Sequence, residues 1–308
     1  MRILLAGTPY FAKIVFEDIL ENTQYDIVGL LTQPDKPFGR KQELKAPETK
    51  QFILSKIPNL PILQPERITS EVLSWVRNLQ PQIIIVVAYG QILPKEFLDI
   101  ALCINIHASI LPNLRGASPL QEMIIKDPRF FGISVMQMEE NLDSGAIFGV
   151  GFIKNTNQDI QTLSTSLALK GAQILKRILQ DLNNTQKEII PLPQCNADSS
   201  YCKKIKKSNG EICFDDARAI YRKYLAFKGW PGIFTKSGLK ILEIINFDTQ
   251  GHFYPAQIVK ILPKSVVVGC ENGTLEITKI QIPSKNPIDI TAYLLGARLK
   301  VGDNLVDS

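Results

Sequence analysis

The stretch Gln82-Ile83-Ile84-Ile85-Val86-Val87-Ala88 decides the fold of this chain. Its middle is entirely β-branched and apolar, which predicts a strand that is buried on both faces. Strands of this kind form parallel sheets covered by helices. Other apolar runs of strand length occupy residues 2–7, 26–32, 103–107 and 133–138. We therefore expect an α/β domain with a Rossmann-like, mostly parallel sheet.

The N-terminus predicts the first βαβ unit of that sheet. Residues 2–7 end in Gly7-Thr8-Pro9, an amphipathic pattern over 11–20 predicts a helix, and residues 26–32 predict the second strand. Ligands of such sheets bind beyond the carboxyl ends of the strands. Gly7, the Ala88-Tyr89-Gly90 turn and His107 all fall at such ends, so one crevice should collect them.

The last third of the chain predicts a second, smaller domain. A long amphipathic helix over 160–181 is followed by a proline-containing, polar stretch that is typical of a linker. Beyond it come a helix over 215–227 and short strands over 240–247, 256–261, 265–270 and 274–281, whose spacing indicates a small OB-like β-barrel. The expected division is an α/β domain over 1–189, a linker over 190–207 and a β-barrel domain over 208–308.

Composition excludes several classes of protein. With 45% hydrophobic and 21% charged residues, the 308-residue chain is neither disordered nor fibrous. No apolar run approaches the roughly 20 residues of a membrane span, and the first run lacks the features of a secretory signal, so we expect a cytoplasmic protein with no membrane contact. Five cysteines without CxxC spacing predict reduced thiols and no metal site. No long heptad pattern occurs, which favours a monomer.

The positive charge of the chain is confined to its last third. After residue 200 there are 16 Lys and Arg against 10 Asp and Glu, whereas the first 200 residues carry 19 against 20. The surplus includes four clustered lysines and a group at helical spacings: Lys203, Lys204, Lys206, Lys207, Arg218, Arg222, Lys223 and Lys228. Such a patch attracts polyanions, although the same pattern also describes a solvated helix face.

Several nucleotide and hydrolase motifs are missing. Gly7-Thr8-Pro9 lacks the GxGxxG glycines of dinucleotide sites, and the chain contains no GxxxxGK[ST]. NAD and ATP are therefore not expected as ligands. No GxSxG is present either, which argues against Ser109 as a hydrolase nucleophile.

Asn105, His107 and Asp143 carry the residue types for acyl transfer. A carboxamide can donate to a developing oxyanion, and an imidazole with a carboxylate can move a proton, so no nucleophilic side chain is needed. Taken singly, each residue also has a structural interpretation: a hydrogen-bonded histidine, an asparagine that completes a turn, or an aspartate in a loop. The residues alone leave both interpretations open.

Several separated motifs resemble the folate-dependent formyltransferases, and within that superfamily the methionyl-tRNA formyltransferase family. They are Ala6-Gly7-Thr8-Pro9, Thr32-Gln33-Pro34-Asp35-Lys36-Pro37 with Gly39-Arg40, Ala88-Tyr89-Gly90 with Ile92-Leu93-Pro94, Asn105-Ile106-His107-Ala108-Ser109-Ile110-Leu111-Pro112, Arg115-Gly116-Ala117-Ser118-Pro119, Gly132-Ile133-Ser134-Val135-Met136, Leu142-Asp143-Ser144-Gly145 and Trp230-Pro231. The resemblance covers nearly the whole chain.

The resemblance implies a reaction and a set of site residues. The formyl group of 10-formyltetrahydrofolate passes to the α-amino group of methionyl-initiator tRNA, without a metal. Asn105 would donate to the oxyanion, and His107 would add a second donor or pass a proton. Asp143 would orient His107 and stabilise its cation, or relay the amine proton through water; both roles stay open. The folate site would be formed by Ser109, Ile110, Leu111, Pro112, Tyr89 and Gly90, with Ile110 in place of the usual leucine.

The resemblance also implies a contact with the acceptor stem. Arg40, Lys41 and Lys45 belong to the basic loop 35–45, although Lys41-Gln42-Glu43 departs from the glycine-rich sequence usual in the family, and an ordinary surface loop is the alternative. The second domain would bind tRNA. Two other functions remain open: a formyltransferase acting on a nucleotide sugar or another small amine, and an RNA-binding protein without catalytic activity.

Overall fold

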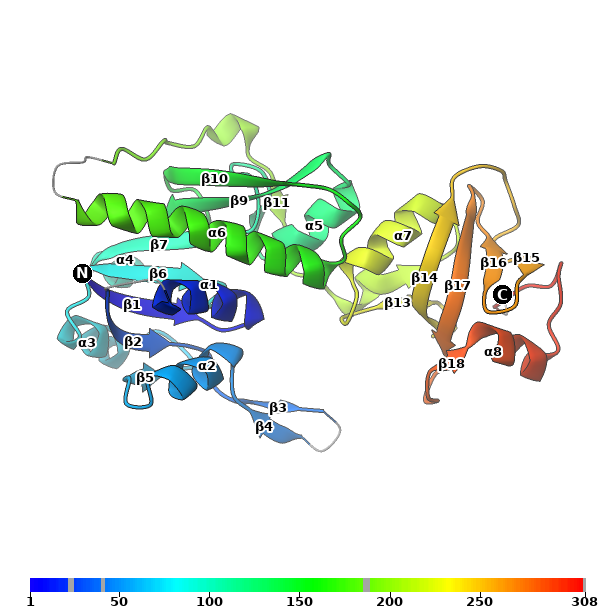
Figure 1. Ribbon diagram of the computed structural model, residues 1–308, viewed down its shortest axis with the longest axis horizontal. Helices are drawn as coiled ribbons and strands as arrows, with labels where there is room; N and C mark the ends of the chain where they lie inside the picture. Colours follow the sequence, from blue (N-terminus) through cyan, green and yellow to red (C-terminus); the bar gives the residue numbers. More distant parts are fainter. Residues whose placement is uncertain (22–24, 40–41, 185–188, 307–308) are drawn as a thin grey trace. The chain divides into compact units, whose positions relative to one another are not determined.

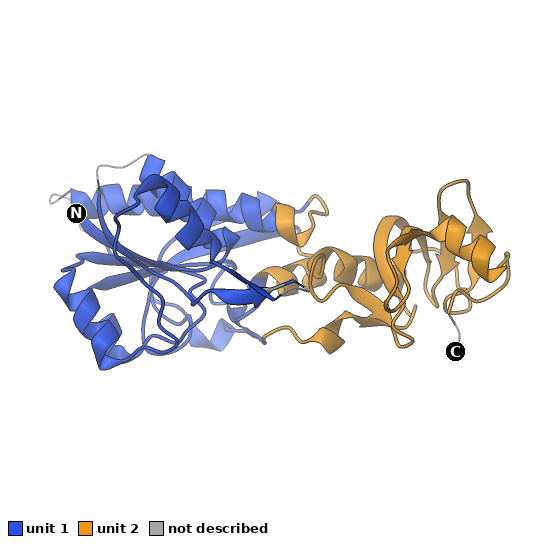
Figure 2. Ribbon diagram, turned by 90° about the horizontal axis from the view of Figure 1, so that it is seen from below, with its two compact units in different colours: residues 1–119, 129–155, 163–203 blue, residues 120–128, 156–162, 204–308 orange. Residues whose placement is uncertain are grey.

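The computed structural model describes residues 1–306 except 22–24, 40–41 and 185–188 (Figure 1). The chain forms two compact units (Figure 2). Unit 1 comprises Met1–Pro119, Arg129–Asn155 and Leu163–Lys203, and unit 2 comprises Leu120–Pro128, Thr156–Thr162 and the chain from Lys204 onward. The units are interleaved along the sequence, so the expected domain limits stay predictions.

The sheet of unit 1 is mostly parallel, as the sequence predicts. Its strand order is β10-β9-β7-β6-β1-β2-β5, in which the five strands from β7 to β5 are parallel and β9 and β10 are antiparallel. The strands are β1 (Arg2–Gly7), β2 (Asp26–Leu31), β5 (Ile62–Leu63), β6 (Ile83–Val87), β7 (Leu102–His107), β9 (Phe130–Gln137) and β10 (Ile147–Lys154). Strand β10 was not predicted, because glycines interrupt its apolar pattern.

Helices cover the sheet of unit 1. They include α1 (Tyr10–Glu21), α2 (Glu48–Lys56), α3 (Ser70–Asn78), α4 (Lys95–Leu98) and α6 (Ile160–Asn183). Helix α5 (Pro119–Lys126) lies almost wholly in the segment Leu120–Pro128 of unit 2. Helix α6 packs closely on β7 and β9, since a Cβ at Gly171 would lie 2.8 Å from side-chain atoms of both Ile106 and Ile133. The residues before and after Ile106 therefore face the other side of the sheet.

The parallel ladders bring three strand ends to one edge. Gly7 pairs in register with Val87, and Val86 pairs with Asn105. The chain therefore leaves β1, β6 and β7 side by side, as expected for the crevice of an α/β sheet. Two small ladders complete unit 1: the hairpin of β3 (Lys36–Phe38) with β4 (Glu43–Lys45), and the parallel pair of β8 (Arg115–Gly116) with β11 (Tyr201–Cys202).

Unit 2 is the β-rich domain that the sequence predicts. Its strand order is β12-β13-β14-β17-β16-β15, and β18 also pairs with β17. The strands are β12 (Glu211–Ile212), β13 (Ile233–Thr235), β14 (Lys240–Asp248), β15 (Ile258–Ile261), β16 (Val266–Gly269), β17 (Thr274–Gln281) and β18 (Ile288–Asp289). Its helices include α7 (Ala217–Ala226) and α8 (Ile290–Ala297), and all of α5 except Pro119 also belongs to this unit. The Asp216 side chain caps α7 by accepting a hydrogen bond from the Ala219 amide.

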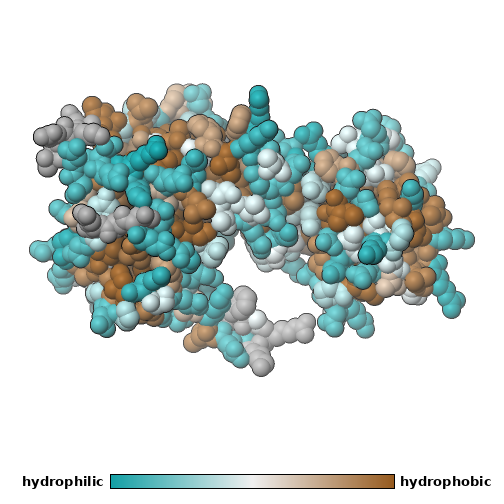
Figure 3. Space-filling model, viewed as in Figure 1, coloured by the Kyte–Doolittle hydropathy of each residue, from teal (hydrophilic) through white to brown (hydrophobic). Residues whose placement is uncertain are grey.

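Within the described residues, none of the helices combines the length and apolar character needed to cross a bilayer. The view in Figure 3 shows hydrophobic side chains scattered among hydrophilic ones on both units, which is ordinary for a folded chain.

Candidate active site

Strand β7 places Asn105 and His107 on one face of the sheet. The two residues are separated by one position, so their side chains point in the same direction. Both are largely buried, and Asn105 retains an exposed fraction of 8%. Within the described chain, the Asn105 amide makes no side-chain hydrogen bond. Its NH2 group is therefore available to donate to an oxygen of a bound molecule.

The His107 ring is held through Nε2. This nitrogen lies 2.9 Å from the carbonyl oxygen of Leu114, and because a carbonyl only accepts, Nε2 carries the hydrogen. The other ring nitrogen, Nδ1, lies 3.6 Å from Oδ2 of Asp143. Both side chains are nearly excluded from water, at 7% and 11% exposure. A positive charge on the ring would thus face a carboxylate in a poorly solvated place.

Asp143 reaches the site from the loop between β9 and β10. Its backbone has a positive φ of 51°, a conformation that aspartate adopts more readily than most residues. Oδ2 accepts a hydrogen bond of 2.8 Å from the Gly116 amide. The structure therefore brings together His107 and Asp143, thirty-six positions apart in sequence, with Asn105 two residues before the histidine.

The turn after β7 is braced by hydroxyl groups. The Ser109 Oγ donates to the Asn113 carbonyl at 2.6 Å. Ser134 of β9 donates to the Ser109 carbonyl and accepts from the Leu111 amide. Ile110 packs against Gly132 so closely that a Cβ there would lie 2.2 Å from Ile110 Cγ1. Leu111 is buried, and the peptide bond to Pro112 is cis.

The other predicted folate segment follows β6. Gly90 has a φ of +86°, and the Tyr89 carbonyl accepts a hydrogen bond from Thr8 Oγ1 at 3.0 Å. The Tyr89 side chain lies in a core cluster, where burial raises the pKa of its phenol. It is therefore turned away from solvent, and this turn offers a ligand mainly its backbone. Gln33, at the end of β2, has a buried Nε2 for which the described residues provide no partner.

The basic loop is only partly described. Arg40 and Lys41 lie outside the described residues. Lys45 is exposed on β4, where its Nζ lies 3.1 Å from Glu48. The loop starts at Asp35, which accepts hydrogen bonds from Lys50 and Gln64. The hydrogen bonds from Gln64 and Lys50 lower the pKa of the Asp35 carboxyl and anchor this end of the loop.

Two groups of basic residues in the last third differ in their partners. Arg218 and Arg222 both pair with Asp127, and Lys228 pairs with Asp159, all within unit 2. These cations are largely neutralised. The four clustered lysines differ, because they are exposed and no ion pair to another described residue holds them: Lys203, Lys204, Lys206 and Lys207.

Two supporting residues had not been identified from the sequence. Arg115 is 2% exposed and donates to Oε1 of Gln194 from Nε and Nη2, at 3.1 and 2.8 Å. Gln194 in turn donates to the carbonyls of Asp143 and Gly145. The stretch that looks like a linker thus contacts the site loop. Only the Arg115-Gly116 pair, within a quoted motif, gave a sequence signal.

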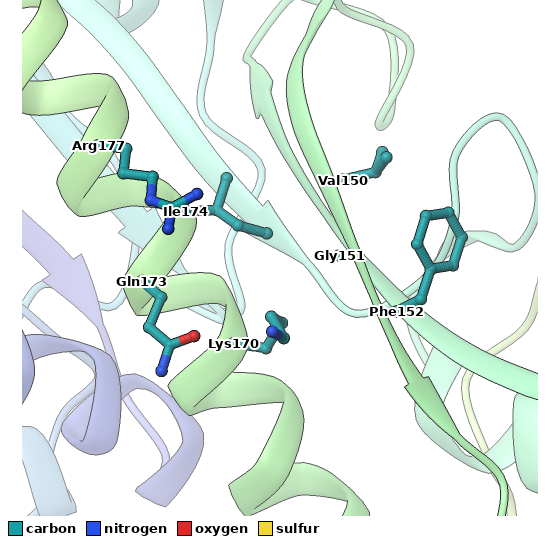
Figure 4. Close-up of a pocket in the computed structure, with 7 residues that line it drawn as sticks. All are labelled: Val150, Gly151, Phe152, Lys170, Gln173, Ile174 and Arg177. Carbon is teal, nitrogen blue, oxygen red and sulfur yellow. The ribbon is translucent and has the colours of Figure 1, made fainter.

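A separate cavity of about 310 Å³ lies at the edge of the sheet (Figure 4). Residues of β10 and α6 line it, among them Phe152, Lys170 and Arg177. It contains none of the predicted site residues. No group of three metal-ligating side chains occurs in the ranges that the structure describes.

Comparison with known proteins identifies the class of this site. Residues 1–179 match the formyl transferase family, and residues 204–298 match the formyl transferase C-terminal domain. The chain belongs to the formyl transferase family.

Within that class the similarity is specific. The chain is 44% identical to a methionyl-tRNA formyltransferase of Helicobacter acinonychis, over 99% of this chain and all of the relative. It is 43% identical to one of Wolinella succinogenes, over 99% of each. It therefore belongs with the methionyl-tRNA formyltransferases, as its motifs indicate.

Solved structures share the fold at low identity. A methionyl-tRNA formyltransferase from Clostridium thermocellum matches with a TM-score of 0.53 and 20% identity, over 81% of this chain and 94% of that one. An N-formyltransferase from Helicobacter canadensis, in complex with folinic acid and dTDP-3-aminofucose, gives a TM-score of 0.66 and 17% identity, over 91% and 99%.

Proposed function

We propose that this chain transfers the formyl group of 10-formyltetrahydrofolate to the α-amino group of methionyl-initiator tRNA. The observation that carries the proposal is the meeting of His107 and Asp143 beside the free amide of Asn105. Similarity to methionyl-tRNA formyltransferases over nearly the full length of the chain, at 44% and 43% identity, supports the choice of acceptor.

The reaction requires a hydrogen-bond donor and a proton acceptor. Attack of a neutral amine develops negative charge on the formyl oxygen and positive charge on the amine nitrogen. The Asn105 NH2 group is free to donate to that oxygen. His107 Nδ1 is the ring nitrogen without a hydrogen-bond partner in the described structure, since Nε2 is held by Leu114, and it accepts the proton. Asp143, 3.6 Å from Nδ1, stabilises the resulting imidazolium. The imidazolium then gives its proton to N10 as the bond between N10 and the formyl carbon breaks, so that tetrahydrofolate leaves neutral and His107 returns to its neutral form.

The folate is proposed to bind along the two turns that leave β6 and β7. The Ser109-Ile110-Leu111-Pro112 turn is rigid, because hydroxyl groups brace it from both sides. Tyr89 and Gly90 supply backbone groups, which suits a flat heterocycle with several donors and acceptors. The buried Nε2 of Gln33 offers a further donor at the same edge of the sheet.

The tRNA is proposed to bind through the loop 35–45, with Arg40, Lys41 and Lys45, through the lysines at the end of the linker, and through the second domain. The exposed cluster Lys203, Lys204, Lys206 and Lys207 is better suited to phosphate contacts than Arg218, Arg222 or Lys228, which are already paired with carboxylates. We also propose that the protein acts in the cytoplasm as a monomer, with the catalytic domain over 1–189, the linker over 190–207 and the tRNA-binding domain over 208–308.

One assay separates this function from the alternatives. Purified protein is mixed with labelled 10-formyltetrahydrofolate and Met-charged initiator tRNA, and label in the tRNA fraction is counted. We expect formylation. No label in the tRNA, with a known formyltransferase active in the same mixture, overturns the proposal. In a parallel mixture an amino sugar nucleotide replaces the tRNA, and label on that sugar but not on tRNA would favour the small-amine alternative.

A variant tests the assignment of the proton acceptor. His107→Ala should abolish turnover and leave tRNA affinity unchanged, because the ring contacts the reacting groups rather than the nucleic acid. If the chain were an RNA-binding protein without catalytic activity, the wild-type protein would bind tRNA but would not formylate it. Turnover by His107→Ala at the wild-type rate removes this residue from the mechanism.

A further inference from the structure

The supporting network around Asp143 begins with a buried cation. Arg115 is 2% exposed, yet its hydrogen-bond partners are neutral oxygens: Oε1 of Gln194, Oδ1 of Asn196 and the Tyr201 hydroxyl. Among the described residues no carboxylate pairs with it. Burying a guanidinium costs free energy unless hydrogen-bond acceptors satisfy its N–H groups. The three neutral oxygens around Arg115 therefore have to be kept in place.

Arg115 fixes the orientation of the Gln194 amide. A guanidinium has only donors, so Gln194 presents its oxygen to Arg115, at 3.1 and 2.8 Å. The amide nitrogen then faces the carbonyls of Asp143 and Gly145, at 2.9 and 2.7 Å. A flipped amide would place oxygen against two carbonyls and NH2 against the cation. The orientation is therefore determined by its neighbours.

Three consecutive residues, Leu114, Arg115 and Gly116, hold both His107 and Asp143 in place. The Leu114 carbonyl accepts from His107, and the Gly116 amide donates to the Asp143 carboxylate. Arg115, between them, holds Gln194, which holds the backbone of Asp143. Asp143 is thus fixed both at its carboxylate and at its carbonyl.

The segment that carries Gln194 also braces this turn. Tyr201 and Cys202 of β11 pair with Arg115 and Gly116 of β8, and the Leu114 amide donates to Ser200 Oγ at 3.0 Å. The residues expected to form a plain linker are therefore attached to the catalytic turn over several positions.

We infer that Gln194 is a positioning residue, which fixes the Asp143 loop so that the carboxylate stays within reach of His107 Nδ1. This inference rests on the proposed formyl transfer. Misplacement of a reacting group by about 1 Å can cost on the order of 100-fold in rate. Neither Gln194 nor Asp143 is among the groups proposed to bind folate or tRNA, so we expect the binding of both substrates to be unchanged. Loss of the Gln194 amide donor should therefore lower kcat and spare KM.

Gln194→Glu is the informative substitution. It keeps an acceptor for Arg115 and adds a charge partner for it, but it removes the donor to both loop carbonyls. We expect kcat to fall by about 100-fold, KM for 10-formyltetrahydrofolate and for Met-tRNA to stay within about twofold, and the unfolding midpoint in urea not to fall. The matched control is Asn196→Ala, which removes a neighbouring acceptor of Arg115 that does not touch the loop; its kcat should fall by no more than about threefold.

A double-mutant cycle separates positioning from a general structural role. On an Asp143→Asn background the carboxylate is already gone, so Gln194→Glu should lower the residual single-turnover rate by less than about threefold. An equal loss on both backgrounds overturns the inference, as does wild-type kcat in Gln194→Glu. If Gln194→Glu fails to fold, Gln194→Met serves instead, because it removes both polar atoms of the side chain and has a similar length. It must then lower kcat and leave KM unchanged. A wild-type chain that does not formylate Met-tRNA contradicts the proposed function instead.

Discussion

Gly132→Ala should displace the turn that we assign to the folate. A Cβ at position 132 would lie 2.2 Å from Ile110 Cγ1 and 2.7 Å from Ile110 Cδ1. Unbonded carbon atoms are at their best separation at about 3.5–4.0 Å, so Ile110 has to move by about 1.3 Å or more. The Gly151 carbonyl of β10 lies 3.0 Å from the added atom and limits movement of β9. The strain therefore falls on the turn 109–112.

The expected cost is that of overpacking in a buried site. Extra methyl groups in well-packed places destabilise by about 1–3 kcal/mol, and we expect about 2 kcal/mol here. The same movement should raise KM for 10-formyltetrahydrofolate several-fold, while KM for Met-tRNA stays near the wild-type value. Urea unfolding followed by Trp75 fluorescence, on a Trp230→Phe background, reports on unit 1.

Two further variants test the reasoning. Gly296→Ala makes the same change in α8 of unit 2, where no atom lies within 4 Å of the added Cβ. It should be neutral or stabilising by up to about 1 kcal/mol in urea unfolding followed by Trp230 fluorescence, on a Trp75→Phe background. Ile110→Ala removes both clashing atoms, so on that background Gly132→Ala should cost less than about 0.5 kcal/mol. An equal cost of Gly132→Ala on both backgrounds refutes the proposed clash with Ile110.

Two other predictions concern buried and partly buried charges. Asp127→Asn should lower the free energy of unfolding of unit 2 by about 3 kcal/mol, because the buried Arg222 loses its carboxylate while Asn still accepts the φ of +51°. A loss below about 1 kcal/mol in urea unfolding, followed by Trp230 fluorescence, contradicts this. Asp35→Asn should destabilise at neutral pH but not in acid. Hydrogen bonds from Gln64 and Lys50 lower the folded pKa below 3.8, so the stabilisation is present above that value and is lost as pH falls through the folded pKa. Thermal unfolding of the wild-type and Asp35→Asn proteins at several pH values tests this. A difference in their unfolding temperatures that grows toward low pH would contradict the prediction.

Much of the fold is predictable because it follows from continuous apolar runs. The strand around Ile84 was predicted to within one residue at each end, since β-branched residues buried on both faces leave few alternatives. Strand β10 was missed because Gly149 and Gly151 replace the side chains that would mark it. In the folded chain these glycines face α6, where a Cβ at Gly151 would meet Ile174 at 2.8 Å.

In the candidate site, too, some residues could be predicted from the sequence and others could not. Asn105 and His107 could be predicted from the end of an apolar strand, whereas the partnership with Asp143 came only through the family resemblance, because no local pattern spans thirty-six residues. Gln194 carries no pattern of its own. It lies between Pro193 and an exposed cysteine, a composition typical of a connection, and its role depends on partners about fifty residues away.

The positioning groups escape sequence reasoning because several of them are backbone atoms. Leu114 acts through its carbonyl and Gly116 through its amide, and nearly every residue offers these. Leu114 has a positive φ of 59°, but only Gly116 requires glycine, since its φ is +112° and a Cβ would lie 2.4 Å from the Cys202 carbonyl oxygen. Side chains to which we assign chemistry therefore leave a signature in the sequence, whereas the contacts proposed to orient them appear only once β8 and β11 are paired. Substituting Gly116 should for this reason disturb Asp143 without altering any reacting group.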